Sequence, residues 1–149
     1  MAIGVKRNET RGWPWAYVGD VAIHAARLRW ADRVPEYALP ALQVLWAHRH
    51  RIGGDFKDIK ELYDALPFGA VVCVVRKTGC LSTHDDNGDD RSLTPDELAC
   101  GDYSPGRWYF PTTNLRRLTV PVLATGRQGP FDLPPAVLPK VLASISTRA

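Results

Sequence analysis

The spacing of apolar residues predicts two buried β-strands. Residues 17–25 alternate between apolar and other side chains, with Val21 and Ile23 on one side, which is the period of a strand with one buried face. Residues 70–76 begin with an uninterrupted apolar run that is rich in valine. Because such a run is typical of a fully buried strand, we expect this segment in the core, together with Cys73.

Helical spacing and capping residues predict four helices. Apolar residues recur every three or four positions in residues 40–51, 59–66 and 137–145. The second of these segments can be capped by Asp55 or Asp58. A capping box, in which Thr94 accepts from the Glu97 amide and Glu97 reaches back to the Thr94 amide, begins a short helix that ends near Cys100.

The remaining apolar segments complete a small α+β barrel. Strand pieces are predicted at residues 107–110 and 114–118, with Pro111 between them at an edge or a bulge. Short strands with few helices and no alternation of strand and helix favour a barrel over a parallel α/β sheet. With 149 residues and neither repeat nor linker, we expect a single domain over residues 1–149.

Composition argues against several classes of protein. The longest apolar run, residues 70–75, is far shorter than the roughly 20 residues of a membrane-spanning helix. The first residues lack the apolar stretch of a signal peptide, so a cytoplasmic protein is expected. The three cysteines form no Cys-x-x-Cys pair, and we expect neither a disulfide framework nor a zinc site, and no cofactor.

Charge is unevenly distributed along the chain. Residues 84–102 contain seven acidic residues and one basic residue, whereas the rest of the chain has a net charge of +9. A basic body suggests a polyanionic partner, although it is equally consistent with a solubilising surface. Residues 84–93 are interpreted as an inserted loop. Their acids only partly match a calcium loop, since Asp90 stands at the glycine position and Asp96 replaces the final glutamate, so no metal is expected.

Four ordered segments resemble the ASCH family of the PUA-like superfamily. Residues 4–13 (GVKRNETRGW) are similar to its signature G-x-K-x-x-E-x-R, and a strand ending in Ile-His-Ala follows at residues 23–25. Three later segments are also similar to the family: residues 66–72, 101–109 and 126–134. The resemblance implies a pseudo-barrel with short peripheral helices, a cleft beside the barrel, and roles in RNA binding or modified-nucleoside chemistry. Family members carry an earlier strand and helix, so the resemblance also implies a truncated N-terminal element.

The signature residues have a physical rationale as a binding site. In an extended segment Glu9 and Arg11 share one face, and Lys6 arrives from the preceding turn. Lys6 and Arg11 can neutralise phosphate, and Glu9 can accept from a base amino group or hold Lys6. Unstacked bases can lie on Trp13 or Trp15. The predicted ligand-binding residues are Lys6, Glu9, Arg11, Trp13, His24, Tyr103 and Arg107.

Plainer interpretations of these residues remain open. Lys6, Glu9 and Arg11 can form an exposed ion-pair cluster that contributes only ~0 to 1 kcal/mol per pair. Trp13, Trp15 and Trp30 can be core or rim aromatics. Two interpretations of His24 also remain open: it can be a hydrogen-bonded strand histidine, or it can line the cleft.

Hydrolysis is the alternative to simple binding, with Lys6 and Glu9 as the catalytic residues. Some ASCH-like proteins resemble amidohydrolases that use a lysine, a threonine and a glutamate. Lys6 matches the lysine, but Glu9 stands at the threonine position and Arg76 at the glutamate position, while Thr10 is expected to point away. This favours an RNA- or nucleotide-binding module over an amidohydrolase, with phosphodiester cleavage as a further alternative.

A third interpretation is a protein-interaction module. A barrel that lacks a strand exposes an edge that can pair with another chain. The expected assembly is a monomer or a weak homodimer.

Overall fold

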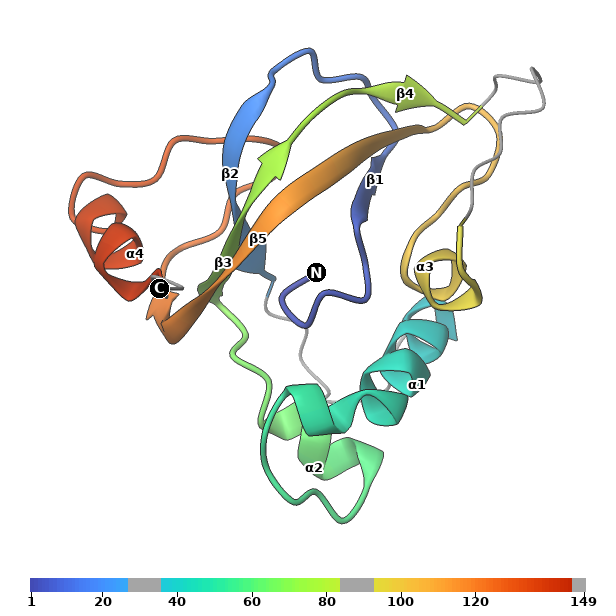
Figure 1. Ribbon diagram of the computed structural model, residues 1–149, viewed down its shortest axis with the longest axis vertical. Helices are drawn as coiled ribbons and strands as arrows, with labels where there is room; N and C mark the ends of the chain where they lie inside the picture. Colours follow the sequence, from blue (N-terminus) through green and yellow to red (C-terminus); the bar gives the residue numbers. More distant parts are fainter. Residues whose placement is uncertain (27–35, 84–92, 146–149) are drawn as a thin grey trace.

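A curved antiparallel sheet organises the molecule (Figure 1). The computed structural model describes residues 1–26, 36–83 and 93–145. The long strand β5 (Trp108–Leu123) is the spine of the sheet. It pairs with β1 (Asn8–Arg11) along one edge of its first residues, and with β3 (Ala70–Lys77) along the other edge of its later residues. The result is a half-barrel in a small α+β domain, in agreement with the predicted fold class at that level.

Two further strands extend this arrangement. β2 (Gly19–Ala25) pairs with the free edge of β3, which gives the order β1-β5-β3-β2. β4 (Leu81–Ser82) follows β3 along the chain and pairs with Trp108 and Tyr109 at the start of β5. The start of β5 is therefore held on both edges, by β1 and by β4.

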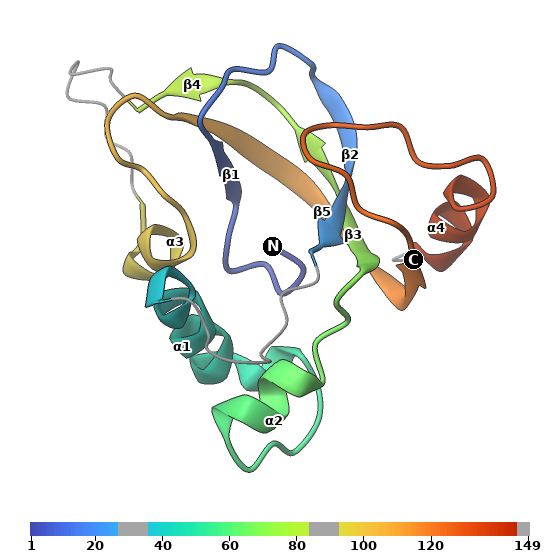
Figure 2. The ribbon, with the colours of Figure 1, turned by 180° about the vertical axis from the view of Figure 1, so that it is seen from behind.

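Short helices lie in two places around the sheet (Figures 1 and 2). α1 (Leu39–Ala47) contacts both α2 (Ile59–Asp64) and α3 (Pro95–Cys100), and these three gather near one end of the sheet. α4 (Leu138–Ser144) packs separately against β5. Single 3₁₀ turns, η1 (Glu36–Ala38) and η2 (Arg49–Arg51), precede and follow α1.

One face of the sheet forms a core with α4. Val71 and Val74 of β3, Leu118 of β5 and Val141 of α4 are buried together. Apolar burial of this kind contributes about 1.5–3 kcal/mol per large side chain. Cys73 is fully buried, as predicted from the valine run.

The strand and helix predictions are confirmed for most segments, with two differences. The helix predicted over residues 40–51 ends at Ala47 and continues only as the turn η2. The two strand pieces around Pro111 are one continuous strand. The Pro111 carbonyl accepts from the Thr78 amide at 2.9 Å, in the segment between β3 and β4. The nitrogen of a strand residue points to the same side as its carbonyl, so the Pro111 nitrogen also points to this segment, and its lack of a hydrogen costs no bond between paired strands.

Capping chemistry is confirmed in part. Asp58 caps α2 by accepting from the Glu61 amide at 2.8 Å. Thr94 caps α3 by accepting from the Glu97 amide at 3.2 Å, but the prediction that the Glu97 carboxylate returns to Thr94 is wrong. The Glu97 carboxylate instead accepts from the amides of Arg7 and Asn8, at the start of β1.

Some predictions fall outside the described residues. These are the interpretations of Trp30 and of residues 84–92, which make up nearly all of the predicted acidic loop. Within the described ranges, no three His, Cys, Asp or Glu side chains gather closely enough to hold a metal ion. No helix in those ranges has both the length and the apolar character to cross a bilayer.

Candidate functional site

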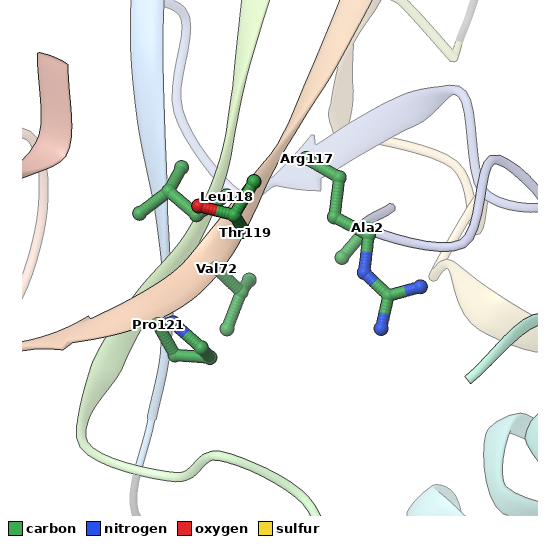
Figure 3. A pocket seen from close by; sticks show the side chains of 6 residues that line it. All are labelled: Ala2, Val72, Arg117, Leu118, Thr119 and Pro121. Carbon is green, nitrogen blue, oxygen red and sulfur yellow. The ribbon is translucent and has the colours of Figure 1, made fainter. Parts of the chain in front are cut away.

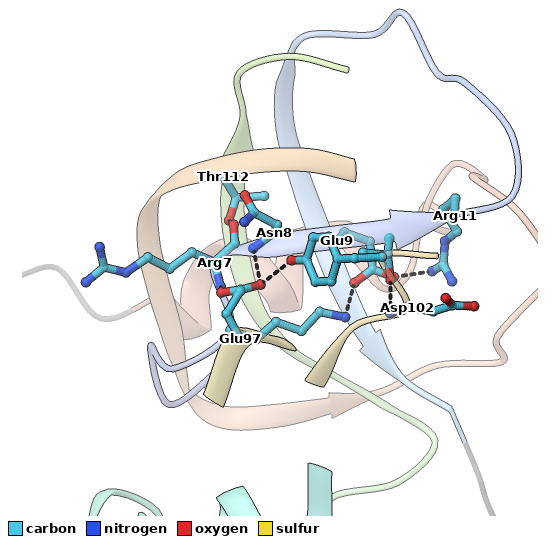
Figure 4. Close-up of polar contacts among 10 residues, drawn as sticks. Arg7, Asn8, Glu9, Arg11, Glu97, Asp102 and Thr112 are labelled. Atoms are coloured by element: carbon cyan, nitrogen blue, oxygen red, sulfur yellow. Dashed lines mark hydrogen bonds and ion pairs between the residues drawn. The ribbon is translucent and has the colours of Figure 1, made fainter. Parts of the chain in front are cut away.

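Lys6, Glu9 and Arg11 form one charged cluster along β1 (Figure 4). The Glu9 carboxylate contacts a cation with each oxygen: Oε2 lies 3.3 Å from Lys6 Nζ, and Oε1 lies 2.7 Å from Arg11 Nη2. The Lys6 and Glu9 side chains are 17% and 23% exposed, whereas Arg11 is 50% exposed. The predicted geometry is confirmed: the alternation of the strand puts Glu9 and Arg11 on one face, and Lys6 reaches them from the preceding turn.

A buried carboxylate, Glu97, fixes the backbone on which this cluster stands. Glu97 is only 4% exposed and accepts from the amides of Arg7 at 2.6 Å and Asn8 at 3.0 Å. It also accepts from the Tyr103 hydroxyl at 2.8 Å (Figure 4). Because charge-assisted hydrogen bonds are stronger than neutral ones, α3 holds the start of β1, and Lys6 with it, in a defined position.

Tyr103 is part of this support. Its pKa is raised, first by burial and second by the hydrogen bond to Glu97, so its hydroxyl keeps its proton and donates. Of the predicted ligand-binding residues, Tyr103 is therefore one that orients the site through Glu97.

Thr10 faces away from the cluster, as predicted. It is 7% exposed, and its hydroxyl oxygen accepts from the Asp102 amide at 3.2 Å. Arg76 is also outside the cluster. It lies on β3 with its guanidinium 3.9 Å from the Asp20 carboxylate. Neither Thr10 nor Arg76 therefore contributes a side chain to the cluster.

Arg107 and Trp13 lie beside the far end of β1. The Arg107 Nε is 3.1 Å from the Asp102 carboxylate, and its Nη1 is 3.8 Å from the place where a side chain on Gly12 would begin. Trp13 packs on Phe110 with the ring centres 6.0 Å apart and remains partly exposed. Arg107 and Trp13 therefore both lie close to Gly12, the residue after Arg11.

His24 is not part of this group. Its Nε2 is 2.9 Å from the Ala124 carbonyl oxygen, and its ring fills the space beside Gly126. His24 pairs across β2 and β3 with Val71, at the end of the sheet opposite to the residues that pair with β1. The structure therefore places His24 in a strand-to-loop contact, the plainer of its two predicted roles.

A cavity of about 340 Å³ opens between the N-terminal segment and the sheet (Figure 3). It is lined by Ala2, Val72, Arg117, Leu118, Thr119 and Pro121. The Arg117 guanidinium donates to the carbonyls of Arg51 at 2.7 Å and Ile52 at 3.3 Å, which ties β5 to the turn after α1. None of the predicted site residues lines this cavity, so the charged cluster and the cavity are separate features.

No protein-family model matches the chain, and no curated protein matches its sequence. What the site can do must follow from its residues. Lys6, Glu9 and Arg11 together carry one net positive charge, and Arg11 presents guanidinium donors to solvent. Such an arrangement suits recognition of an anion, and of phosphate in particular, because the guanidinium fork matches two oxygens at once.

Proposed function

We propose that this chain is an RNA-binding domain of the ASCH type, related to PUA domains, that recognises single-stranded or structured RNA or a nucleotide at the Lys6–Glu9–Arg11 cluster. The observation that carries the proposal is the position of Glu9 between the two cations, at 3.3 Å from Lys6 and 2.7 Å from Arg11. The order of the signature and of three further segments along the chain supports the family, and the half-barrel sheet is compatible with it.

Preorganisation is the physical reason for the proposal. A lysine and an arginine on a mobile segment would lose side-chain freedom on binding phosphate, which costs about 0.5–1.5 kcal/mol for each side chain that is immobilised. Here Glu9 already restrains both, and Glu97 restrains the backbone between them. The exposed part of Arg11 can then contact a phosphate while Glu9 keeps its other side occupied.

The surroundings of the cluster favour a nucleic acid over a free anion. Arg107 and the partly exposed Trp13 lie just beyond Arg11. Nucleic-acid sites combine cations for the phosphates with aromatic faces for the bases. The net charge of +9 outside residues 84–102 adds long-range attraction for a polyanion.

Binding is favoured over hydrolysis. Both Glu9 oxygens contact cations, and Thr10 is turned towards Asp102, so the cluster shows no pairing of a base with a hydroxyl nucleophile. We therefore assign Lys6 and Glu9 to recognition.

Titration of a fluorescently labelled single-stranded RNA at low salt tests the proposal. Lys6→Met and Arg11→Met should each weaken binding several-fold, since each removes a phosphate contact. Lys140→Met is the matched control, because Lys140 is an exposed lysine on α4, on the separate helix that packs against β5. The proposal fails if the wild-type protein shows no saturable binding, or if Lys140→Met weakens binding as much as the two site variants.

A further inference from the structure

The loop between β1 and β2 carries aromatic side chains, and the buried side chain of Lys77 donates hydrogen bonds to its backbone. We call residues 12–18 (GWPWAYV) the aromatic loop. Lys77, at the end of β3, is 2% exposed, and its ammonium donates to the carbonyls of Trp15 at 2.7 Å and Tyr17 at 2.6 Å. The Trp15 amide also donates to Cys80 Sγ at 3.4 Å. The loop backbone is therefore fixed at three points.

The environment of Lys77 is unusual for a lysine. No described carboxylate pairs with its ammonium, which lies 4.7 Å from the centre of the Phe110 ring and 5.4 Å from that of Trp15. Burial lowers its pKa, because the charged form loses its hydration. Burial of a charged ammonium costs free energy unless the group is hydrogen-bonded. Here the hydrogen bonds of Lys77 go to the backbone of the exposed loop.

The loop presents a ready-made aromatic surface. Tyr17 stacks on Trp15 with the ring centres 5.2 Å apart and an angle of 21° between the planes, and Tyr17 remains 45% exposed. The Tyr17 hydroxyl donates to the Asp20 carbonyl at 3.2 Å, which fixes the Tyr17 ring beside the start of β2. Gly19 makes this possible, since its φ of 153° favours glycine and any side chain there would meet the Tyr17 hydroxyl.

Arginines lie at both ends of the aromatic loop. At its start, Arg107 is beside Gly12, directly after Arg11. At its end, the Asp20 carboxylate is 2.6 Å from Arg116 and 3.9 Å from Arg76, on the next two strands of the sheet. The four arginines and the Lys77 ammonium place five cations against the three carboxylates of Glu9, Asp20 and Asp102 around the loop.

We propose that the aromatic loop is a stacking platform for an unpaired base of an RNA strand, with the exposed face of Tyr17 as the contact and the flanking arginines at the neighbouring phosphates. This inference rests on the proposed function and extends it from the phosphate cluster to the base. A strand of alternating flat bases and negative charges matches a rigid aromatic face between two sets of arginines. The surplus of positive charge favours a nucleic acid over an apolar peptide.

The test compares two oligonucleotides of about ten nucleotides, one with bases and one abasic, which share the same phosphates. The wild-type protein should bind the strand with bases about 5- to 150-fold more tightly for each stacked base. Tyr17→Ala should lower that ratio by the factor for one stacked base, about 5- to 150-fold, with the abasic strand as the reference for the phosphate contacts. Tyr17→Phe keeps the ring and should keep the ratio.

The outcomes separate this inference from the function on which it rests. If the wild-type protein binds both strands equally, and more weakly at higher salt, the stacking platform is wrong and the phosphate cluster stands. If Tyr17→Ala keeps the full ratio, Tyr17 is not the platform and the inference is overturned. If neither strand binds at low salt, the proposed function fails first, and the platform fails with it.

Discussion

Replacement of Glu97 by glutamine changes one atom of the carboxylate that positions β1. Oε1 accepts from the Asn8 amide and the Tyr103 hydroxyl, and Oε2 accepts from the Arg7 amide at 2.6 Å. In Glu97→Gln the amide oxygen can keep the first two bonds, but the new NH₂ group then faces the Arg7 N–H, donor against donor. The variant therefore loses one short charge-assisted bond and leaves a donor unsatisfied.

The size of this effect follows from burial. A hydrogen bond to a charged group contributes about 1.5–3 kcal/mol, and an unsatisfied buried donor costs about 1–3 kcal/mol. Because Glu97 is only 4% exposed, water cannot readily replace the lost acceptor. We expect Glu97→Gln to lower the free energy of unfolding by about 2–4 kcal/mol, and Glu97→Ala to lower it further, since all three donors then lose their acceptor.

Glu61→Gln is the matched control. Glu61 stands at the same position of a short helix, α2, and accepts from the Lys57 amide at 2.7 Å, but it is exposed. Water can satisfy that amide, so the control should cost less than about 1 kcal/mol. Urea unfolding followed by circular dichroism gives both values, and amide exchange at Arg7 and Asn8 should accelerate only in the Glu97 variants. Equal costs for Glu97→Gln and Glu61→Gln would refute the reasoning.

Three further predictions concern the core and the turns. Burial raises the pKa of Cys73 to about 11. The unfolded chain releases this proton near its ordinary pKa of 9.0, so the stability that Cys73 contributes is present below pH 9 and is lost between pH 9 and 11. Unfolding at a series of pH values should show this fall, and Cys73→Ala should remove its share of the slope. Thr94→Ala should lower the free energy of unfolding by about 0.5–2 kcal/mol, since it removes the N-cap of α3, whereas Thr94→Ser should cost less. Gly19→Ala should cost about 1–3 kcal/mol through its strained backbone, and the tyrosine fluorescence of the variant should report a displaced Tyr17. A Gly19→Ala protein as stable as the wild type would contradict the last of these.

Local patterns were enough to predict most elements and the charged cluster. The valine run marks β3, and the caps at Asp58 and Thr94 mark two helix starts, because each depends on residues that are close in sequence. The cluster of Lys6, Glu9 and Arg11 follows from the same logic. Once the segment is extended, strand geometry puts Glu9 and Arg11 on one face, and Lys6 is close enough in sequence to reach Glu9 from the preceding turn.

The supporting contacts could not be predicted in this way. Glu97 reaches amides about 90 positions away in sequence, and its match to a capping box indicated a local partner instead. Continuity of β5 through Pro111 depends on the gap between β3 and β4, which no local pattern reveals. One signal was available for Lys77: it follows Cys73 and Val75 at the spacing of a strand, so its side chain falls on a buried face.

The salt dependence of RNA binding tests the central claim most directly. The dissociation constant of a labelled single-stranded RNA should be measured over a range of salt concentrations for the wild-type protein, for Lys6→Met/Arg11→Met and for Lys140→Met. If the cluster binds phosphate, binding weakens as salt rises, and the double variant lowers the slope of log K against log salt by about 1.4, which is roughly 0.7 for each lost contact to a single strand. Lys140→Met should keep the wild-type slope. An unchanged slope in the double variant, or no saturable binding by the wild-type protein at low salt, would contradict the account.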